Sequence, residues 1–210
     1  MLRLSARLAV LAVGTKVVAN NFNSHTDAGA TLPSRCLSPP SIDSKQLIGC
    51  GMRRKLFFDV YMAALYADEK SVKQLQKRLQ DKATTIPEAI LNEQGKSSAS
   101  ILLTFRRNVS KAQFIDAILQ AFDGFTPSEV GNLRQYFESV VESDLKVGDV
   151  VEISWLIKGG FMVRKNNGQG LCYDATKEAY TRLLEVYLDP KRSVAPDLIA
   201  STRETILQLK

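Results

Sequence analysis

Two adjacent arginines, Arg53 and Arg54, stand directly before an apolar segment in the stretch GMRRKLFFDVYMAALYADE, which covers residues 51–69. The guanidinium group carries a permanent positive charge and can donate paired hydrogen bonds to a carboxylate. A cation at the mouth of an apolar slot would orient a ligand that has an acidic head and a hydrocarbon tail. The other interpretation is an exposed turn between two strands, and the residues alone favour that one.

Few other residues in the chain could support catalysis or metal binding. The single histidine, His25, lies in a polar N-terminal stretch, so neither a Ser-His-Asp or Cys-His catalytic pair nor a His-rich metal site is expected. The three cysteines show no CxxC or other metal-ligand spacing. The sequence therefore predicts no metal site and no cofactor.

The composition, with 45% hydrophobic and 24% charged residues in a chain of 210, is that of a globular domain. No run approaches about 18 apolar residues, so no integral membrane span is expected. Residues 1–40 hold four Lys or Arg against one Asp, which accounts for +3 of the net charge of +6. The remainder is only mildly basic and has no basic stripe interleaved with aromatic residues, so no nucleic-acid partner is expected.

The N-terminal region has the features of a targeting segment and a linker. Residues 1–19 contain three basic residues and no acidic ones, which favours import into an organelle, with the mitochondrion ahead of the secretory pathway or a plastid. Residues 20–45 are rich in Asn, Ser, Thr, Gly and Pro, as in a disordered linker. The folded domain is expected to cover residues 46–210.

Hydrophobic periodicity predicts several strands in antiparallel groups. The segments with the strand pattern are QLIGCG, KLFFDVYMAALYA, SASILLTF, GDVVEISWL and FMVRK. The second of these, residues 55–67, is apolar on both faces, which predicts a central strand covered on both sides. The NNG sequence after FMVRK predicts a tight turn.

Helix signals occur mostly in pairs rather than alternating with single strands. Ser110 with Gln113, and Thr126 with Glu129, match the spacing of capping boxes at two helix starts. Further helical stripes cover residues 71–83 and most of the last third of the chain. The expected class is therefore α+β, an antiparallel sheet covered by a layer of helices.

Four segments, in this order, resemble the chalcone isomerase family: LIGCGMRRKLFFDVYMAALYADE, FRRNVSKAQF, KVGDVVEISWLIKGGFMVRKNNGQGL and SVAPDLIAS. The resemblance extends over residues 46–208. Gly-x-Arg followed by a Val-Tyr…Leu-Tyr strand is typical of the isomerase-like branch. The resemblance implies an open-faced β-sandwich, with a ligand cleft between the sheet and the helices.

The resemblance also assigns candidate site residues. The family arginine, which holds a phenolate in the isomerases and a carboxylate in the fatty-acid-binding members, corresponds to Arg53. The strand threonine of the isomerases corresponds to Tyr61, a replacement found in the fatty-acid-binding branch. The catalytic tyrosine corresponds to Phe114, which has no hydroxyl and so cannot relay a proton.

Further along, the family's catalytic asparagine corresponds to Ala121. The pair that sets specificity corresponds to Val186 and Tyr187, which lack the expected small hydroxyl-bearing residue. Two polar catalytic groups are thus replaced by apolar ones, and this weighs against cyclisation chemistry.

The expected cleft would suit an alkyl chain. Its predicted lining consists of Phe57, Phe58, Tyr61, Leu65, Phe105, Phe114 and Trp155. An unbroken strand would, however, separate Arg53 from Tyr61 by about 26 Å, at about 3.3 Å per residue. The two residues could share one carboxylate only if the chain folds back between them.

The resemblance therefore implies a non-catalytic protein that binds a fatty acid or a similar apolar carboxylate, with Arg53 at the carboxylate and with Tyr61 and Phe114 in contact with the ligand. The alternative is an intramolecular lyase that cyclises a chalcone or another enone, with Arg53 stabilising the developing negative charge. Haem binding is disfavoured because the only histidine lies outside the domain. The sequence gives no indication of oligomeric state.

Overall fold

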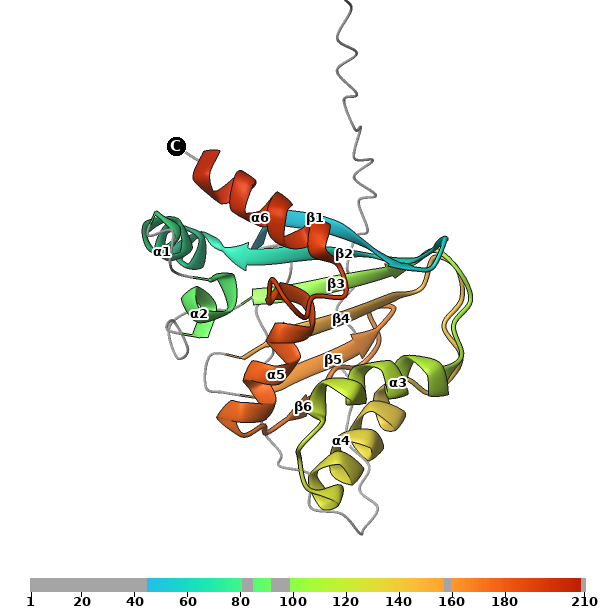
Figure 1. The fold of residues 1–210 in the computed structure, drawn as a ribbon. Coiled ribbons are helices and arrows are strands. Elements are labelled where there is room, and N and C mark those ends of the chain that lie inside the picture. Colours follow the sequence, from blue (N-terminus) through green and yellow to red (C-terminus); the bar gives the residue numbers. More distant parts are fainter. Residues whose placement is uncertain (1–44, 81–84, 92–98, 157–159, 209–210) are drawn as a thin grey trace, which may run out of the picture. The chain divides into compact units, whose positions relative to one another are not determined.

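The computed structural model describes residues 45–80, 85–91, 99–156 and 160–208. The expected targeting segment, and the expected linker up to residue 44, lie outside the described residues. The described part is built on one antiparallel sheet of six strands in sequential order (Figure 1). The strands are β1 (Lys45–Lys55), β2 (Phe58–Asp68), β3 (Ala99–Phe105), β4 (Val150–Trp155), β5 (Phe161–Lys165) and β6 (Leu171–Tyr173).

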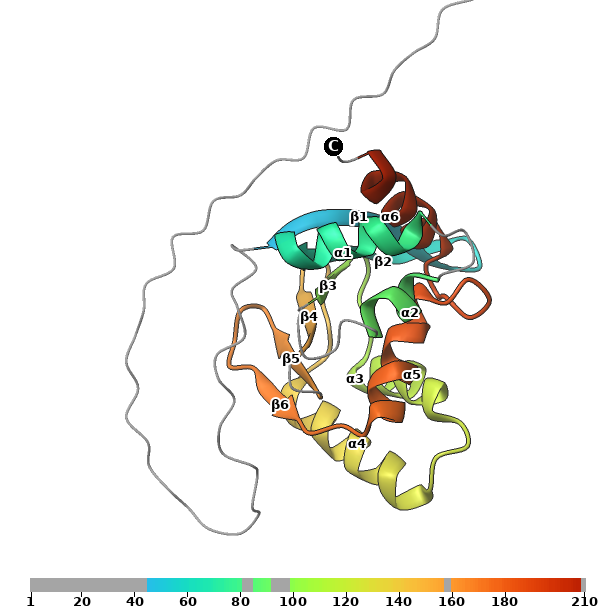
Figure 2. The ribbon, with the colours of Figure 1, turned by 90° about the vertical axis from the view of Figure 1, so that its left-hand side faces the viewer.

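The helices follow the sheet in groups, as the sequence predicted. They are α1 (Glu69–Leu79), α2 (Ile86–Leu91), α3 (Lys111–Leu119), the 3₁₀ turn η2 (Gln120–Phe122), α4 (Pro127–Val140), α5 (Lys177–Leu188) and α6 (Pro196–Gln208). Figure 2 shows α2, α3, α5 and α6 on the same face of the sheet. The expected α+β class, an antiparallel sheet with a helical layer, is confirmed.

Local sequence signals place several of the element ends. The Ser110 hydroxyl accepts from the Gln113 backbone N–H at 3.1 Å, and the Gln113 side chain accepts in return from Ser110. Thr126 and Glu129 form the same reciprocal cap on α4. At the NNG turn, Asn166 and Asn167 both adopt positive φ, which asparagine tolerates better than most residues. These three predictions are confirmed.

The stretch from residue 51 to residue 69 differs from the expectation of one long strand preceded by a short one. The chain turns at Leu56 and Phe57, so that Lys55 lies opposite Phe58 and β1 pairs with β2. Strand β2 lies inside the sheet between β1 and β3, as predicted, and its odd-numbered residues are buried from Tyr61 to Ala67. On the other face Val60 is only half-buried and Phe58 is exposed. The prediction of a strand covered on both sides was wrong here, because the apolar residues 56–58 form a hairpin end rather than a strand interior.

Two glycines bring α6 onto the edge strand. A Cβ at Gly49 would fall 2.0 Å from the Thr202 hydroxyl, and one at Gly51 would fall 2.2 Å from the backbone nitrogen of Leu198. Residues 49, 51 and 53 point to the same face of β1, because side chains alternate along a strand. The absence of two side chains therefore lets α6 cover β1 closely, and Arg53 is the first large side chain on this face beyond that contact.

We expect Gly51→Ala to lower the free energy of unfolding by about 1–3 kcal/mol, because the new methyl group would meet backbone atoms of α6 that cannot yield without moving the helix. Urea denaturation followed by circular dichroism measures the change. Gly131→Ala is the matched control: no atom lies within 4 Å of its added Cβ, and an alanine within α4 should be neutral or stabilising by about 0.5–1 kcal/mol. Equal stability of Gly51→Ala and the unchanged chain would contradict the close-packing argument.

Candidate functional site

The antiparallel register of β1 and β2 makes Arg53 and Tyr61 direct cross-strand partners. The guanidinium carbon of Arg53 lies 5.7 Å from the centroid of the Tyr61 ring, within the range of a cation–π contact. The turn at residues 56 and 57 thus supplies the chain reversal that the two residues need in order to reach one carboxylate. The separation of about 26 Å expected for an unbroken strand does not apply.

Arg53 and Tyr61 face a cavity of about 510 Å³ between the β1–β2 hairpin and helices α3 and α5. This volume lies within the usual range of about 300–1,000 Å³ for small-molecule sites. The apolar part of its wall includes Phe58, Val60, Phe105, Phe114, Ile118 and Val186. The structure therefore brings the three predicted site residues, Arg53, Tyr61 and Phe114, to the wall of one cavity.

A third polar residue completes the inner end of the site. The Tyr61 hydroxyl is hydrogen-bonded to Tyr187 and also accepts a hydrogen bond from the Arg53 guanidinium. Burial raises the pKa of Tyr61, against the lowering effect of the Arg53 charge. Burial, together with the neighbouring Tyr61, raises the pKa of Tyr187 well above its usual range. Both phenols are therefore neutral hydrogen-bond donors at physiological pH.

The two adjacent arginines have different surroundings. Arg54 is exposed and forms ion pairs with Asp59 at 3.1 Å and with Asp197 at 3.4 Å. Arg53 is half-buried, and no carboxylate of the described residues forms an ion pair with it. An arginine that faces a cavity without a protein counter-ion attracts an anion, and this distinguishes Arg53 from its neighbour.

The aromatic wall is continuous from the sheet to α3. The Phe105 ring makes an edge contact with Tyr61, with centroids 5.4 Å apart, and another with Phe114 at 5.7 Å. Phe114 is buried on α3 and, like Phe105, borders the cavity. Phe114 therefore presents only hydrocarbon to the cavity.

Three residues of the predicted lining do not border the cavity. Phe57 projects into solvent at the hairpin end, and Leu65 and Trp155 are buried in the core beneath the helices. Phe57 lies in the turn outside either strand, and for Leu65 and Trp155 the position along the strand keeps them from the cavity. The prediction that they line the cleft was wrong.

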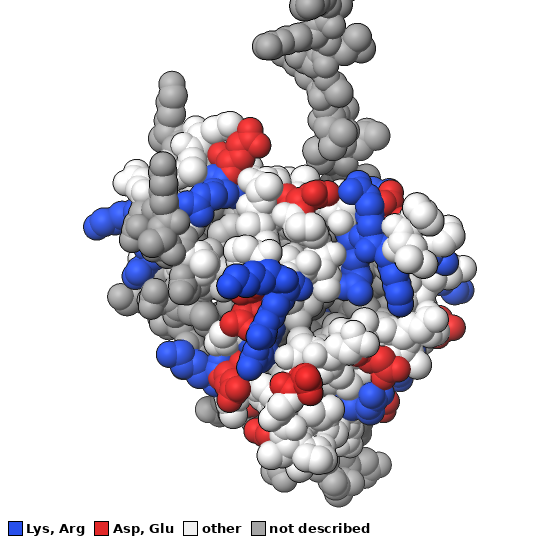
Figure 3. Space-filling view, viewed as in Figure 1, with Lys and Arg blue, Asp and Glu red and all other residues white. Residues whose placement is uncertain are grey.

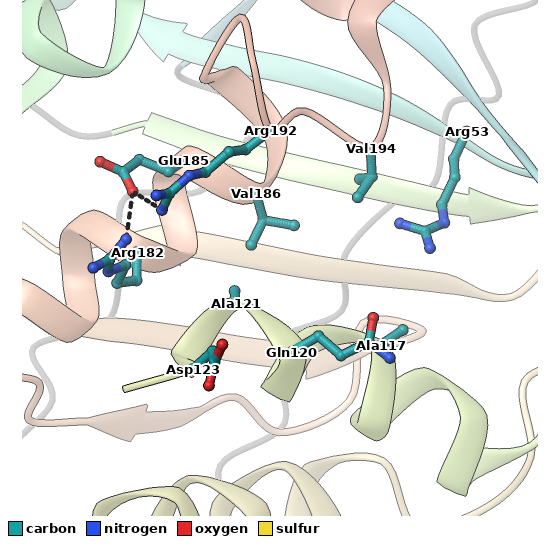
Figure 4. A pocket seen from close by; sticks show the side chains of 10 residues that line it. All are labelled: Arg53, Ala117, Gln120, Ala121, Asp123, Arg182, Glu185, Val186, Arg192 and Val194. Atoms are coloured by element: carbon teal, nitrogen blue, oxygen red, sulfur yellow. Dashed lines mark hydrogen bonds and ion pairs between the residues drawn. The ribbon is translucent and has the colours of Figure 1, made fainter. Parts of the chain in front are cut away.

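A second hollow of about 470 Å³ adjoins the first and shares Arg53 and Val186 with it. Figure 4 shows Arg53 at one end of this hollow and Arg182, Glu185 and Arg192 at the other. Glu185 pairs with both of these arginines at 3.5 Å. Ala121 borders this second hollow and offers no polar side chain.

The contribution of Tyr187 was missed by sequence reasoning. The residue lies on the buried stripe of α5 among Leu183, Leu184 and Leu188, and this pattern is the same for a core tyrosine and a site tyrosine. The only sequence signal for Tyr187 was that the resemblance assigns it to a specificity position of the family. A small hydroxyl-bearing residue is expected at that position, so the hydroxyl of Tyr187 itself was overlooked. Only the packing of α5 against the sheet brings this hydroxyl to Tyr61.

The inner site, by which we mean Arg53, Tyr61 and Tyr187, can donate hydrogen bonds and supply positive charge, but none of its three side chains is a general base. Its polar groups are one guanidinium and two neutral phenols, while the acidic residue of the wall, Asp116, is exposed and paired with Arg134 at 2.8 Å. Within the described ranges, no group of three His, Cys, Asp or Glu residues could hold a metal ion. Also within those ranges, no helix is long and apolar enough to cross a membrane.

Comparison with known proteins gives a family and a fold. A family model described as chalcone isomerase-like matches residues 40–193, which confirms the resemblance drawn from the four segments. A solved structure that matches is that of the Arabidopsis thaliana fatty-acid binding protein AtFAP1, with 16% sequence identity and a TM-score of 0.58. The match covers 79% of this chain and 89% of that chain, and at this identity it shows a shared fold alone. No curated protein matches the chain.

We expect Tyr187→Phe to change how stability depends on pH. Folding raises the pKa of the Tyr187 hydroxyl, so above pH 10 this hydroxyl ionises in the unfolded chain before it ionises in the folded protein. The contribution of Tyr187 to the free energy of unfolding is therefore complete below pH 10 and is lost as the pH rises above 10. In that range the free energy of unfolding should fall less steeply for the variant, by about 1.4 kcal/mol per pH unit. Urea denaturation at several pH values between 8 and 11 measures the slopes, and parallel curves for the two proteins would contradict the assignment.

Proposed function

The chain belongs to the chalcone isomerase-like family, and we propose that it is a non-catalytic member that binds a fatty acid or a similar apolar carboxylate. The observation that carries the proposal is the position of Arg53, which faces an aromatic-walled cavity without a protein counter-ion among the described residues. Tyr61 and Tyr187 lie beside it as neutral donors.

In this proposal the carboxylate of the ligand lies at the inner polar cluster. Its oxygens accept hydrogen bonds from the Arg53 guanidinium and from a tyrosine hydroxyl. Charge-assisted hydrogen bonds of this kind are roughly twice as strong as neutral ones. The cluster would therefore select an acid over the corresponding alcohol and fix the direction in which the chain enters.

The hydrocarbon tail of the ligand lies along the apolar wall formed by Phe105, Phe114, Ile118 and their neighbours. Each buried methylene contributes about 0.8 kcal/mol, so a long chain supplies most of the affinity. Phe114 supports this role, because a phenyl ring in place of a tyrosine removes a hydroxyl that an alkyl chain would leave without a partner. The likeness in fold to a fatty-acid binding protein is a further support.

A second candidate is an intramolecular lyase that cyclises an enone. The two hydroxyls at Tyr61 and Tyr187 favour it, since with Arg53 they could stabilise a developing enolate and return a proton to it. Against it stand Phe114 and Ala121 in the positions of two polar catalytic groups. The absence of a base from the inner site also disfavours it, because a phenolic substrate would have to arrive already ionised.

We expect Arg53→Ala to weaken the binding of tetradecanoic acid by roughly ten- to a hundredfold, since charge-assisted hydrogen bonds contribute about 1.5–3 kcal/mol. Displacement of a fluorescent fatty acid measures the affinity, and tetradecan-1-ol serves as the uncharged ligand. The variant should lose the preference for acid over alcohol. Arg54→Ala is the matched control, since Arg54 is paired on the surface. Equal effects of the two substitutions would contradict the role of Arg53.

We expect a hydroxychalcone to cyclise no faster with the protein than in buffer, because the position of the family's catalytic tyrosine holds a phenylalanine. Chiral chromatography of the flavanone product measures both the rate and the enantiomer ratio. Clear acceleration towards one enantiomer, lost in Arg53→Ala, would favour the lyase.

Extraction of the protein purified from a heterologous host, followed by mass spectrometry, should yield co-purified fatty acids.

A further inference from the structure

The end of the β1–β2 hairpin exposes three consecutive large apolar residues. The exposed fractions are 83% for Leu56, 97% for Phe57 and 55% for Phe58. Phe57 makes no part of the cavity wall, so its exposure is not explained by the ligand site. Contiguous exposed apolar side chains are uncommon on a monomeric protein and mark a surface that contacts something else.

The backbone of this turn makes the choice of residues more unusual. Leu56 has φ of 56°, in the left-handed region that favours glycine or asparagine. Two-residue hairpin loops are normally built from Asn-Gly, Asp-Gly or similar pairs. Here Leu and Phe occupy both loop positions, so local turn chemistry does not account for them.

Cations surround this apolar tip. Lys55, Arg106 and Arg107 are exposed, and in the described part of the chain none of them forms an ion pair with a carboxylate. The guanidinium carbon of Arg107 lies 4.6 Å from the centroid of the Phe58 ring, which ties one cation to the tip. In the space-filling view, Lys and Arg side chains gather at the end of the sheet where the hairpin turns (Figure 3).

An apolar tip within a ring of unpaired cations matches the surface of an anionic bilayer, where aromatic and aliphatic groups enter the headgroup region and cations attract the lipid charge. It matches a protein interface less well. Three such side chains bury at most about 750 Å², taking the upper end of about 150–250 Å² for each aromatic residue, which is less than the roughly 800 Å² that each partner buries in a standard interface. We infer that the tip, Leu56–Phe58 with Lys55, Arg106 and Arg107, docks the protein onto anionic membranes.

Docking would also bring the ligand cavity to the lipid. Lys55, Leu56, Phe58 and Arg107 belong both to the tip and to the cavity wall. An amphiphile leaving the bilayer would therefore reach the cavity without crossing water. This consequence rests on the proposed function, whereas docking itself depends only on the exposed tip and its charges.

Vesicle flotation with the full chain tests the inference. The protein should float with vesicles of phosphatidylcholine and phosphatidylglycerol in a ratio of about 7:3, and much less with vesicles of phosphatidylcholine alone. Roughly 30% of anionic lipid is enough to give the negative surface potential that attracts basic residues. Phe57→Ser should weaken the binding at least about tenfold, from the loss of one inserted aromatic side chain. Lys55→Gln combined with Arg106→Gln should weaken it about thirtyfold, at about fivefold for each charge.

Matched controls separate the tip from the rest of the surface. Leu207→Ser removes an exposed apolar residue on α6, and Lys70→Gln combined with Lys177→Gln removes two exposed cations elsewhere. Both should bind the anionic vesicles as the unchanged chain does. Every variant retains residues 1–44, so differences between variants report on the substituted positions.

A second measurement follows the tip directly. The indole introduced by Phe57→Trp should shift its emission to shorter wavelength on anionic vesicles and be quenched by brominated lipid, while Trp155, which is buried, gives a constant background. Emission that does not change with vesicles would overturn the inference.

Two further outcomes would also overturn it. One is equal flotation of Phe57→Ser and the unchanged chain. The other is a change from dimer to monomer on Phe57→Ser, seen by analytical ultracentrifugation, with vesicle binding unaltered. Fatty-acid binding in solution should be the same for Phe57→Ser and the unchanged chain, so a failure of docking is distinguishable from a failure of the ligand proposal.

Discussion

The pairing of Arg53 with Tyr61 across the β1–β2 hairpin is the interaction on which the candidate site depends. A reversal of the chain within two residues turns a separation of eight positions into a cross-strand contact. The guanidinium then lies over one phenol ring, and that phenol in turn meets Tyr187 from α5. A positive charge and two neutral donors are thereby held beside the aromatic part of the cavity wall.

The packing of α6 on the edge strand β1 leaves the Arg53 guanidinium facing the cavity. Gly49 and Gly51 let α6 lie directly on β1, and Arg53 extends from the same face just past the contact. Its neighbour Arg54 is exposed and forms ion pairs with two carboxylates, one on β2 and one on α6. The pairing register of β1 and β2 is irregular between these two arginines, and of the two only Arg53 borders the cavity.

The same hairpin joins the ligand cavity to the surface of the protein. Arg53 and Tyr61 supply a positive charge and a hydroxyl to the cavity wall, and the outer residues form the exposed tip for which we propose membrane docking. Phe58 and Arg107 belong to both, because they line the cavity and stack on each other at its edge. The proposed binding and the proposed docking would therefore be coupled by geometry, since one short segment contributes both to the cavity wall and to the exposed tip.

The sequence by itself determined the class of fold, the family, the two capping boxes and the asparagine turn, and it singled out Arg53, Tyr61 and Phe114, which border one cavity. These follow from signals within a few residues of one another, or from motifs compared one position at a time. Only the tertiary structure decided where the strand reverses, because an apolar Leu-Phe turn lacks the glycine or asparagine that marks a hairpin. Only the tertiary structure decided which buried aromatics border the cavity, and that Tyr187 brings a hydroxyl to it, because periodicity gives the face of an element and not its depth or its neighbour.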